Sequence, residues 1–344
     1  MTYELPPTDD RAVWDTWLSM HYLPNLTVAD ELGVFKSLHE SPAGAVELAG
    51  RLGYDRRTTI AVVRMLAALG YLRQRLGVYE LTDTARLYLL KDSPYYWGYM
   101  LGNRTDLHDT LKQRLQGRSP AGIPGHRPED AKRDTSANSW ASGKIDIDRA
   151  RRVAAAMHSH SLPAATGLAR NVSFAGVSRL LDIGAGSGCY PIAVARANPL
   201  LRATIMELPA MCDVAKEYIK AGGVSDRLDT VAVDMFRESW PKGYDAVFFA
   251  NVWHDWNFET CAWLAQQTFD ALPAGGRIFL HEMLLDNDGD GPATTVSFSM
   301  LMLGTEGQQF TLPELKGLLE GARFSDVQAQ HTYGYYSLVS AQKG

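Results

Sequence analysis

The stretch LLDIGAGSGCYPIAVA, residues 180–195, decides the fold. Its apolar beginning predicts a buried strand, and its end predicts a helix. Between them, Gly184, Gly186 and Gly188 stand at alternate positions, where glycine lets the backbone adopt positive φ and approach a ligand closely. A plain tight turn would explain the same glycines, and the spacing is neither the GxGxxG of a dinucleotide site nor the GxxxxGK(S/T) of a phosphate loop. The stretch therefore predicts a strand, a turn and a helix, with the turn as a candidate ligand site.

From residue 178 onward, short apolar strands alternate with amphipathic helices. The predicted strands are RLLDIGA (179–185), RATIMEL (202–208), DTVAVDMF (229–236), YDAVFFANV (244–252) and GRIFLHEML (276–284). This alternation is typical of a doubly wound, Rossmann-like α/β sheet. The last two strands, FSDVQAQHT (324–332) and YYSLVSAQK (335–343), are separated by two residues, so we expect them to pair as a hairpin.

Residues 12 to about 165 show mostly helical patterns instead. Within them, residues 28–90 predict a helix, a turn, a helix and a small hairpin, which is the winged-helix order. We expect LTVADELGVFKSLHE, residues 26–40, to form one amphipathic helix. Residues 41–90 hold seven arginines against four acidic residues and no lysine, as a DNA-binding module could. Because that excess is small, we favour a winged helix that packs and dimerises.

The composition limits the class of protein. The chain has 344 residues, 46% of them hydrophobic, and a net charge of −5, which gives no global bias toward nucleic acid. Its three cysteines, Cys189, Cys212 and Cys261, form no CxxC pair and indicate neither a disulfide framework nor a zinc site. The acidic N-terminus does not resemble a signal peptide, and no apolar run reaches the ~18 residues that a membrane span needs. We expect a cytoplasmic protein without a membrane partner, a nucleic-acid partner or a bound metal.

Two acidic residues at the ends of predicted strands narrow the choice of ligand. Glu207 ends the second strand, where a carboxylate accepts both hydroxyls of a ribose. Asp234 ends the third strand beside Met235 and Phe236, which suits the amine and the ring of an adenine. The glycine turn carries no lysine or arginine that would neutralise a pyrophosphate. S-adenosylmethionine fits this description.

Four motifs, LLDIGAGSG, MELP, DMF and NVWHDW, resemble in order and spacing those of the small-molecule O-methyltransferase family, which includes plant caffeate and acetylserotonin enzymes and bacterial natural-product enzymes. The resemblance covers nearly the whole chain. It implies a homodimer with a winged-helix dimerisation domain at residues 1–100, connecting helices at 101–165 that contribute to the substrate pocket, and a Rossmann-like S-adenosylmethionine-binding catalytic domain at 166–344. It also implies methylation of a small aromatic metabolite in natural-product biosynthesis, with a phenolic oxygen as the acceptor.

The resemblance assigns residues to the cofactor. It implies that Gly184 meets the amino-acid moiety, Glu207 the ribose, and Asp234 with Met235 the adenine. Met157 and Ser161, in AAAMHSHSL, would border the cofactor from the helix before the sheet. The family often has lysine or serine just after the fourth strand, where this chain has Ala250 followed by Asn251. The predicted cofactor residues are Met157, Ser161, Gly184, Gly186, Glu207, Asp234, Met235, Phe236 and Asn251.

His254, in NVWHDW, stands at the family's position for the general base, with Asp255 beside it. An imidazole can take up the proton of a phenol near neutral pH. Glu282, in FLHEML, matches an acid that flanks this histidine and would orient it. Gln309, in GTEGQQFT, stands where the family often has a second acid; a glutamine cannot hold charge on the imidazole but can hydrogen-bond a substrate. The residues expected around the acceptor are Trp97, Trp253, Trp256, Met283, Phe298, Met302 and Gln309.

Three alternatives stay open at this point. Some relatives methylate an aromatic ring carbon or a 2-oxo acid, and one branch uses an iron ion near the same histidine. Its ligands would be His254, Asp255, His281 and Glu282, but neighbours on a strand point to opposite faces, which argues against the pair His281 and Glu282. Other relatives bind S-adenosylmethionine without methylating, and a winged-helix DNA-binding regulator is the third alternative. The sequence leaves the substrate, the methylated atom and the pathway undetermined.

Overall fold

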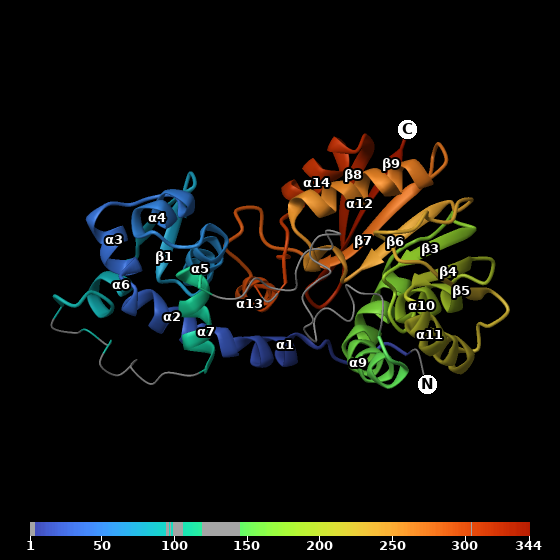
Figure 1. The fold of residues 1–344 in the computed structure, drawn as a ribbon, viewed down its shortest axis with the longest axis horizontal. Coiled ribbons are helices and arrows are strands. Elements are labelled where there is room, and N and C mark those ends of the chain that lie inside the picture. Colours follow the sequence, from blue (N-terminus) through green and yellow to red (C-terminus); the bar gives the residue numbers. More distant parts are fainter. Residues whose placement is uncertain (1–3, 94–95, 97, 99–105, 119–144, 304) are drawn as a thin grey trace. The chain divides into compact units, whose positions relative to one another are not determined.

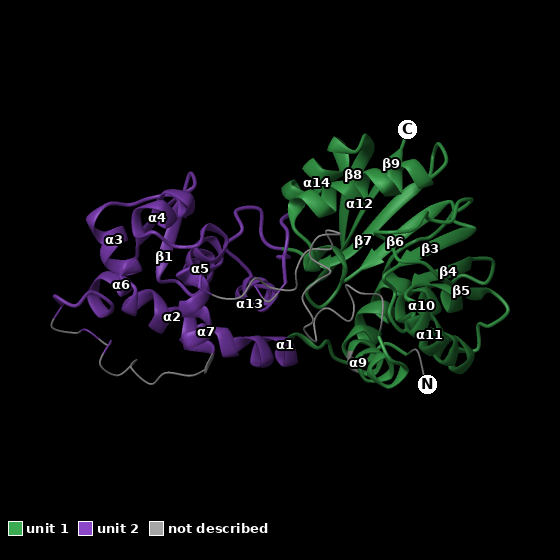
Figure 2. Cartoon of the chain, in the orientation of Figure 1, with its two compact units in different colours: residues 1–11, 123–284, 312–344 green, residues 12–122, 285–311 purple. Residues whose placement is uncertain are grey.

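The computed structural model describes residues 4–93, 96, 98, 106–118, 145–303 and 305–344. These residues form two compact units (Figure 2). The sheet unit consists of the described residues within 1–11, 123–284 and 312–344, and the helical unit consists of those within 12–122 and 285–311. Each unit is therefore assembled from segments that lie far apart in the sequence.

A mixed seven-stranded sheet forms the centre of the sheet unit. Its order is β5 (Leu228–Ala232), β4 (Arg202–Glu207), β3 (Arg179–Ile183), β6 (Ala246–Ala250), β7 (Arg277–Met283), β9 (Tyr336–Lys343) and β8 (Phe324–Tyr333). The five strands from β5 to β7 are parallel, whereas β9 is antiparallel to both β7 and β8. The predicted α/β sheet and its terminal hairpin are confirmed. Because the winding direction reverses between β3 and β6, the carboxyl ends of these two strands mark the place where open α/β sheets bind ligands.

Helices cover both faces of this sheet (Figure 1). One face carries α9 (Ile147–Asn171), α10 (Cys189–Ala197) and α11 (Pro209–Gly222), and the other carries α12 (Phe258–Ala271) and α14 (Leu312–Gly321). The sequence requires this cover, because strands such as β6, with sequence AVFFA, are apolar on both sides. The three free cysteines, Cys189, Cys212 and Cys261, are all buried in this unit.

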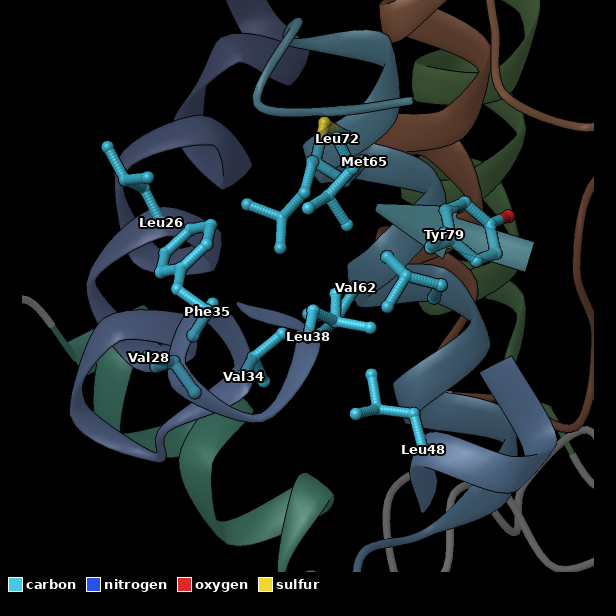
Figure 3. Close-up of a cluster of buried hydrophobic side chains, with 14 of the residues drawn as sticks. Leu26, Val28, Val34, Phe35, Leu38, Leu48, Val62, Met65, Leu72 and Tyr79 are labelled. Atoms are coloured by element: carbon cyan, nitrogen blue, oxygen red, sulfur yellow. The ribbon is translucent and has the colours of Figure 1, made fainter. Parts of the chain in front are cut away.

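The helical unit contains the predicted winged-helix elements. They are α2 (Tyr22–Glu31), α3 (Val34–Glu40), α4 (Ala45–Leu52), α5 (Arg56–Ala68), β1 (Leu72–Arg75), β2 (Val78–Leu81) and α6 (Asp83–Tyr88). α1 (Arg11–Leu18) and η1 (Ser19–His21) come before them, and α7 (Asp106–Leu115) and α13 (Ala293–Met302) come after them in the chain. Figure 3 shows the apolar core of this unit, in which Leu26, Phe35, Leu38, Val62 and Met65 are buried together. The predicted hairpin is confirmed by the antiparallel pairing of β1 with β2.

The expectation of one helix over residues 26–40 was wrong. The structure has two helices there, α2 and α3, because the chain turns at Leu32 and Gly33. Gly33 has a φ of 76°, in the left-handed region that glycine adopts without steric cost and that commonly ends a helix. Apolar residues on either side of the turn, including Leu26 and Phe35, still enter the same core, so the hydrophobic pattern stayed intact across the break.

Arg57, in the second helix of the winged-helix order, points into the protein rather than toward a nucleic acid. Its guanidinium donates to the backbone carbonyl oxygens of Thr305, at 2.8 Å, and Met302, at 2.9 Å, and also to that of Gly307. These carbonyls lie at and just after the end of α13, where the last turn of a helix leaves acceptors unpaired. Arg57 therefore fixes the end of α13 and is occupied in doing so. Among the described residues, no helix combines the length and apolar composition needed to cross a membrane.

Candidate active site

The glycine turn lies between β3 and α10, at the carboxyl edge of the sheet. Gly184, Gly186 and Gly188 have φ angles of 70°, 56° and 74°, which side chains rarely tolerate. A β-carbon at Gly188 would lie 2.3 Å from Cδ1 of Ile205, so a side chain at this position would also require Ile205 to move. The backbone N–H of Gly186 donates to Oε1 of Glu207 at 3.0 Å. The turn thus presents bare backbone beside a carboxylate.

The two acids that the sequence singled out lie at the ends of neighbouring strands. Glu207 ends β4, and its Oε2 accepts from the backbone N–H of Leu208 at 2.9 Å. Burial raises the pKa of Glu207. Because each carboxylate oxygen accepts more than one hydrogen bond, Glu207 can still receive a pair of hydroxyls. Asp234 follows β5, and its Oδ1 accepts from the backbone N–H of Phe236 at 3.0 Å.

An aromatic cluster stands next to Asp234. The ring of Phe236 stacks on Trp263 with centroids 5.6 Å apart, and it meets the ring of Trp256 edge to face at 4.8 Å. Met235, between the acid and this cluster, accepts a hydrogen bond at its backbone oxygen from Trp240 Nε1 at 2.8 Å. The structure therefore brings Trp256, predicted for the acceptor, together with Phe236, predicted for the cofactor.

Asp182, in β3 just before the glycine turn, is a site residue that the sequence reasoning missed. Its side chain is only 1% exposed, and within the described structure neither carboxylate oxygen has a hydrogen-bond partner. Burial, reinforced by the charge of Glu207, raises the pKa of Asp182 well above its usual value. A buried acid without partners is costly unless a ligand compensates it. An aspartate inside the apolar run LLDI was the sequence signal that could have revealed it.

Histidines of α9 were also missed, although they lie between the predicted residues Met157 and Ser161. Nδ1 of His158 lies 2.8 Å from Oγ of Ser187, which ties α9 to the glycine turn. Nε2 of His160 lies 3.5 Å from the sulfur of Met157. Burial, followed by the charge of His254, lowers the pKa of His160 to about 4, so its ring is neutral at neutral pH. Met157 itself is half-exposed, and Ser161 is buried.

His254 and Glu282 form a buried pair at the same edge of the sheet. His254 lies in the short helix η3 (Trp253–Asp255), soon after β6, and Glu282 lies near the end of β7. Nδ1 of His254 is 2.8 Å from Oε2 of Glu282, and Oε1 of Glu282 accepts from the backbone N–H groups of Val252 and Trp253, each at 3.1 Å. One carboxylate thus fixes both the imidazole and the turn that carries it. Asp255, which is partly exposed, has Oδ1 3.8 Å from Nε2 of His254.

The protonation of His254 follows from these neighbours. Burial by itself lowers the pKa of the imidazole. The charges of Glu282 and Asp255 and the hydrogen bond to Glu282 raise this pKa, and together they outweigh burial, so that the pKa of His254 is raised to about 9. The raised pKa keeps the imidazole of His254 protonated at neutral pH. When the imidazole of His254 loses its proton from Nε2, that nitrogen can accept a proton from another group.

The other predicted residues of the sheet unit take different positions. Trp253 is fully buried, with its ring edge to face against Phe249 at 5.9 Å, so it fills core space. Met283 is also fully buried, at the end of β7. Asn251 follows β6 with a φ of 55°, and its Nδ2 donates to the hydroxyl of Tyr190 at 3.4 Å.

His281 points to the face of β7 opposite to Glu282. Its ring stacks on Tyr336 with centroids 5.1 Å apart, and its Nε2 lies 2.7 Å from Oγ1 of Thr332. Burial lowers the pKa of His281 to about 3, so its ring stays neutral. The alternation along the strand thus separates the two residues, as the sequence argument expected.

Three residues predicted around the acceptor belong to the helical unit. Phe298 and Met302 are buried on α13, where the ring of Phe298 lies 5.7 Å from that of Trp14. Gln309 is buried after α13, and its backbone N–H donates to Oγ of Ser299 at 3.0 Å. Trp97 lies outside the described residues.

The residues at the carboxyl edge of the sheet fit S-adenosylmethionine. The bare backbone of the glycine turn and the uncompensated acid Asp182 suit a cationic amino-acid moiety, and Glu207 suits a ribose. Asp234 and the apolar side chains next to it suit an adenine. A doubly wound α/β sheet that carries these residues at its carboxyl edge is typical of S-adenosylmethionine-dependent methyltransferases, and we assign the protein to this class.

Comparison with known proteins gives the family. Residues 131–325 match the O-methyltransferase domain, and residues 14–91 match the O-methyltransferase dimerisation domain. The chain belongs to this O-methyltransferase family and depends on S-adenosylmethionine.

Individual relatives cover most of the chain. A 3-hydroxy-5-methyl-1-naphthoate 3-O-methyltransferase from Streptomyces sahachiroi is 34% identical over 88% of this chain and 86% of its own length. A family 2 O-methyltransferase from Planctomyces limnophilus, solved in complex with apigenin, is 28% identical, with a TM-score of 0.86 over 99% of this chain and 98% of that one. The methyltransferase PigF from a Serratia species, solved with SAH, is 27% identical, with a TM-score of 0.57 over 98% of this chain and all of that one.

We predict that cofactor affinity depends on pH through Asp182. Because burial keeps this acid protonated to a higher pH than usual, and a cationic ligand favours its ionised form, affinity should rise with pH and binding should release a proton. Asp182→Asn should weaken S-adenosylmethionine binding about tenfold or more at neutral pH and flatten the pH dependence. Isothermal titration calorimetry between pH 5.5 and 8, in buffers of different ionisation enthalpy, measures both effects.

The matched control is Asp229→Asn, which alters an exposed acid on β5. It should leave the affinity and the proton release unchanged. If Asp182→Asn behaves like this control, Asp182 does not compensate the positive charge of the cofactor.

Proposed function

We propose that this enzyme transfers a methyl group from S-adenosylmethionine to a phenolic oxygen of a small aromatic metabolite, with His254 as the general base. The observation that carries the proposal is the buried His254 and Glu282 pair at the carboxyl edge of the sheet that also carries the glycine turn. The relative from Streptomyces sahachiroi, named as a methyltransferase of a naphthoate hydroxyl, supports the acceptor class and a role in natural-product biosynthesis.

His254 would act through Nε2. A free phenol has a pKa of ~10 and is mostly protonated at neutral pH, so it is a weak nucleophile until a base takes its proton. Nδ1 is engaged by Glu282, which fixes the orientation of the ring and stabilises the imidazolium that forms. In molecules whose imidazole is neutral, the proton moves from the phenol to Nε2 as the phenolic oxygen gains electron density, and it later leaves to solvent.

The bound cofactor supplies an electrophilic methyl group on a sulfonium ion. Because methyl transfer is an in-line displacement, much of the rate should come from alignment of the acceptor oxygen. Glu282 serves that alignment through its bonds to the N–H groups of Val252 and Trp253, which fix the turn before the imidazole. We also propose that Asp255, whose Oδ1 lies 3.8 Å from Nε2 of His254, takes part in catalysis beside this base, and that the residues predicted around the acceptor contact it.

The identity of the product tests the proposed function. With methyl-labelled cofactor and a panel of phenols and 2-oxo acids, we expect the label on a phenolic oxygen, as read by NMR. His254→Ala should lower kcat by about 10²- to 10⁴-fold and leave cofactor affinity nearly unchanged, because the residue acts on the proton of the acceptor. A label on a ring carbon would replace oxygen with carbon as the acceptor, and full turnover by His254→Ala would remove this residue from the mechanism.

The pH dependence of kcat should report the ionisation of His254. Because the base must be neutral and its pKa is about 9, kcat should rise with pH and level off above that value. Glu282→Gln removes a charge that raises this pKa, so the rising limb should move to lower pH while the plateau falls. Stopped assays across pH 6 to 10 measure both changes; an unmoved limb in Glu282→Gln would show that the two residues are not coupled.

We also propose that the chain is a homodimer through its N-terminal region. The match to the dimerisation domain at residues 14–91 supports this, and so do the exposed apolar side chains Val13, Trp17 and Leu23 of α1 and α2. A second copy of the chain is the occupant that would cover them.

Trp17→Glu should therefore convert the dimer to a monomer, because it places a charge in an apolar interface. Light scattering after size-exclusion chromatography measures the mass. Leu76→Glu, at the fully exposed tip of the β1–β2 hairpin, is the control and should remain a dimer. A dimeric Trp17→Glu variant would exclude this surface.

A further inference from the structure

His158 joins three elements of the sheet unit. It lies on α9, and its Nδ1 is 2.8 Å from Oγ of Ser187 in the glycine turn. Its ring lies against the ring of Tyr218 on α11, with centroids 4.5 Å apart and an interplanar angle of 32°. The residue is buried, at 5% exposure. One side chain thus connects α9, α11 and the turn.

The part of α9 before His158 is fixed by apolar packing against α11. The residues in this small core are Ile145, Ala150, Ala154, Met211 and Val214. His158 lies four positions after Ala154, so it continues the same face of the helix. Its bond to Ser187 therefore adds a directional contact at the end of an interface that is otherwise apolar.

The glycine turn depends on contacts from outside itself. Because Gly184, Gly186 and Gly188 lack side chains, the turn has few contacts of its own, and glycine backbones lose much freedom when they are ordered. The N–H of Gly184 donates to the carbonyl oxygen of Met206 at 3.1 Å, and that of Gly186 donates to Glu207. These two bonds reach the turn from β4, and His158 reaches Ser187 from α9.

We propose that His158 is a positioning residue for S-adenosylmethionine, which acts through Ser187 to hold the glycine turn in its binding conformation. It rests on the proposed function only in taking this turn as a contact of the cofactor. Met157 and Ser161, the cofactor residues predicted on α9, lie one position before and three positions after His158. The same bond therefore sets the spacing between these residues and the turn, and such preorganisation lowers the cost of binding.

The bond between His158 and Ser187 works without charge. Burial lowers the pKa of His158, so its ring is neutral at neutral pH. A neutral imidazole has one donor and one acceptor, and a hydroxyl can donate or accept. His158 therefore supplies geometry to the cofactor site, whereas Asp182 is suited to compensate positive charge.

A double-mutant cycle tests this role, with S-adenosylmethionine as the probe and no acceptor present. His158→Phe keeps a ring against Tyr218 but loses the bond, and Ser187→Ala removes the same bond with a smaller change. Each should raise the Kd measured by isothermal titration calorimetry about five- to tenfold. Because both remove one interaction, the double variant should bind within about twofold of the single variants.

Two further variants separate the bond from a general effect on the helix. His158→Asn places an amide atom near the position of Nδ1 and should restore most of the affinity. Thr166→Val is the matched control, because Oγ1 of the buried Thr166 donates to the carbonyl oxygen of Leu162 within α9, at 2.8 Å. It removes a hydrogen bond of the same helix that does not reach the turn, and it should leave the Kd unchanged.

Hydrogen exchange measures the turn itself. Without cofactor, the backbone amides of residues 184–188 should exchange faster in His158→Phe than in the wild type, while those of the β8–β9 hairpin should keep their rates. Faster exchange throughout the sheet unit would instead mean that His158 serves only general stability, which overturns the positioning role.

The outcomes also separate this role from the proposed function. Unchanged affinity in His158→Phe and Ser187→Ala, or losses that multiply in the double variant, overturn the role of His158. So does a Thr166→Val variant that binds as weakly as His158→Phe, or a His158→Asn variant that recovers no affinity. Because binding is measured without acceptor, failure to methylate any phenol would overturn the proposed function and leave this role standing.

Discussion

The carboxylate of Glu282 holds together the end of the sheet unit that carries His254. It is buried on β7, and its three hydrogen bonds all run to the segment that follows β6. Since an unpaired charge at that depth would be strongly destabilising, the turn at Val252 and Trp253 and the ring of His254 must stay in place to compensate it. The parallel pairing of Ala250 with His281 brings the ends of β6 and β7 level with each other, which places Glu282 within hydrogen-bond distance of the turn after β6.

Other buried polar groups differ in whether the described structure gives them hydrogen-bond partners. One ring nitrogen of His281 contacts Thr332, and one ring nitrogen of His158 contacts Ser187, so both histidines join elements of the fold. Asp182 has a backbone fixed within β3, but among the described residues its carboxylate oxygens have no hydrogen-bond partner. A buried acid without a partner is destabilising, and the positive charge of a cationic ligand would compensate it.

Much of this architecture is predictable from the sequence, because the strands are apolar runs and the glycine turn has a distinctive spacing. The α/β sheet, its final hairpin and the winged-helix order all follow from such local patterns. The break at Gly33 was missed because the apolar periodicity continues through it. Asp182 was missed because a sequence shows an acid in a strand but not whether any group reaches it. Trp253 and Trp256 are three positions apart and look equivalent in the sequence, yet the first fills the core and the second meets Phe236.

The cysteines lie in one unit only, so the two units differ in whether a thiol reagent can modify them. Cys189, Cys212 and Cys261 are shielded thiols of the sheet unit, and the segments 12–122 and 285–311 contain no cysteine. A thiol-specific reagent can therefore modify the chain only when the sheet unit opens. The rate of that modification would measure opening of the cofactor-binding half by itself, whatever the helical half is doing, without any engineered label.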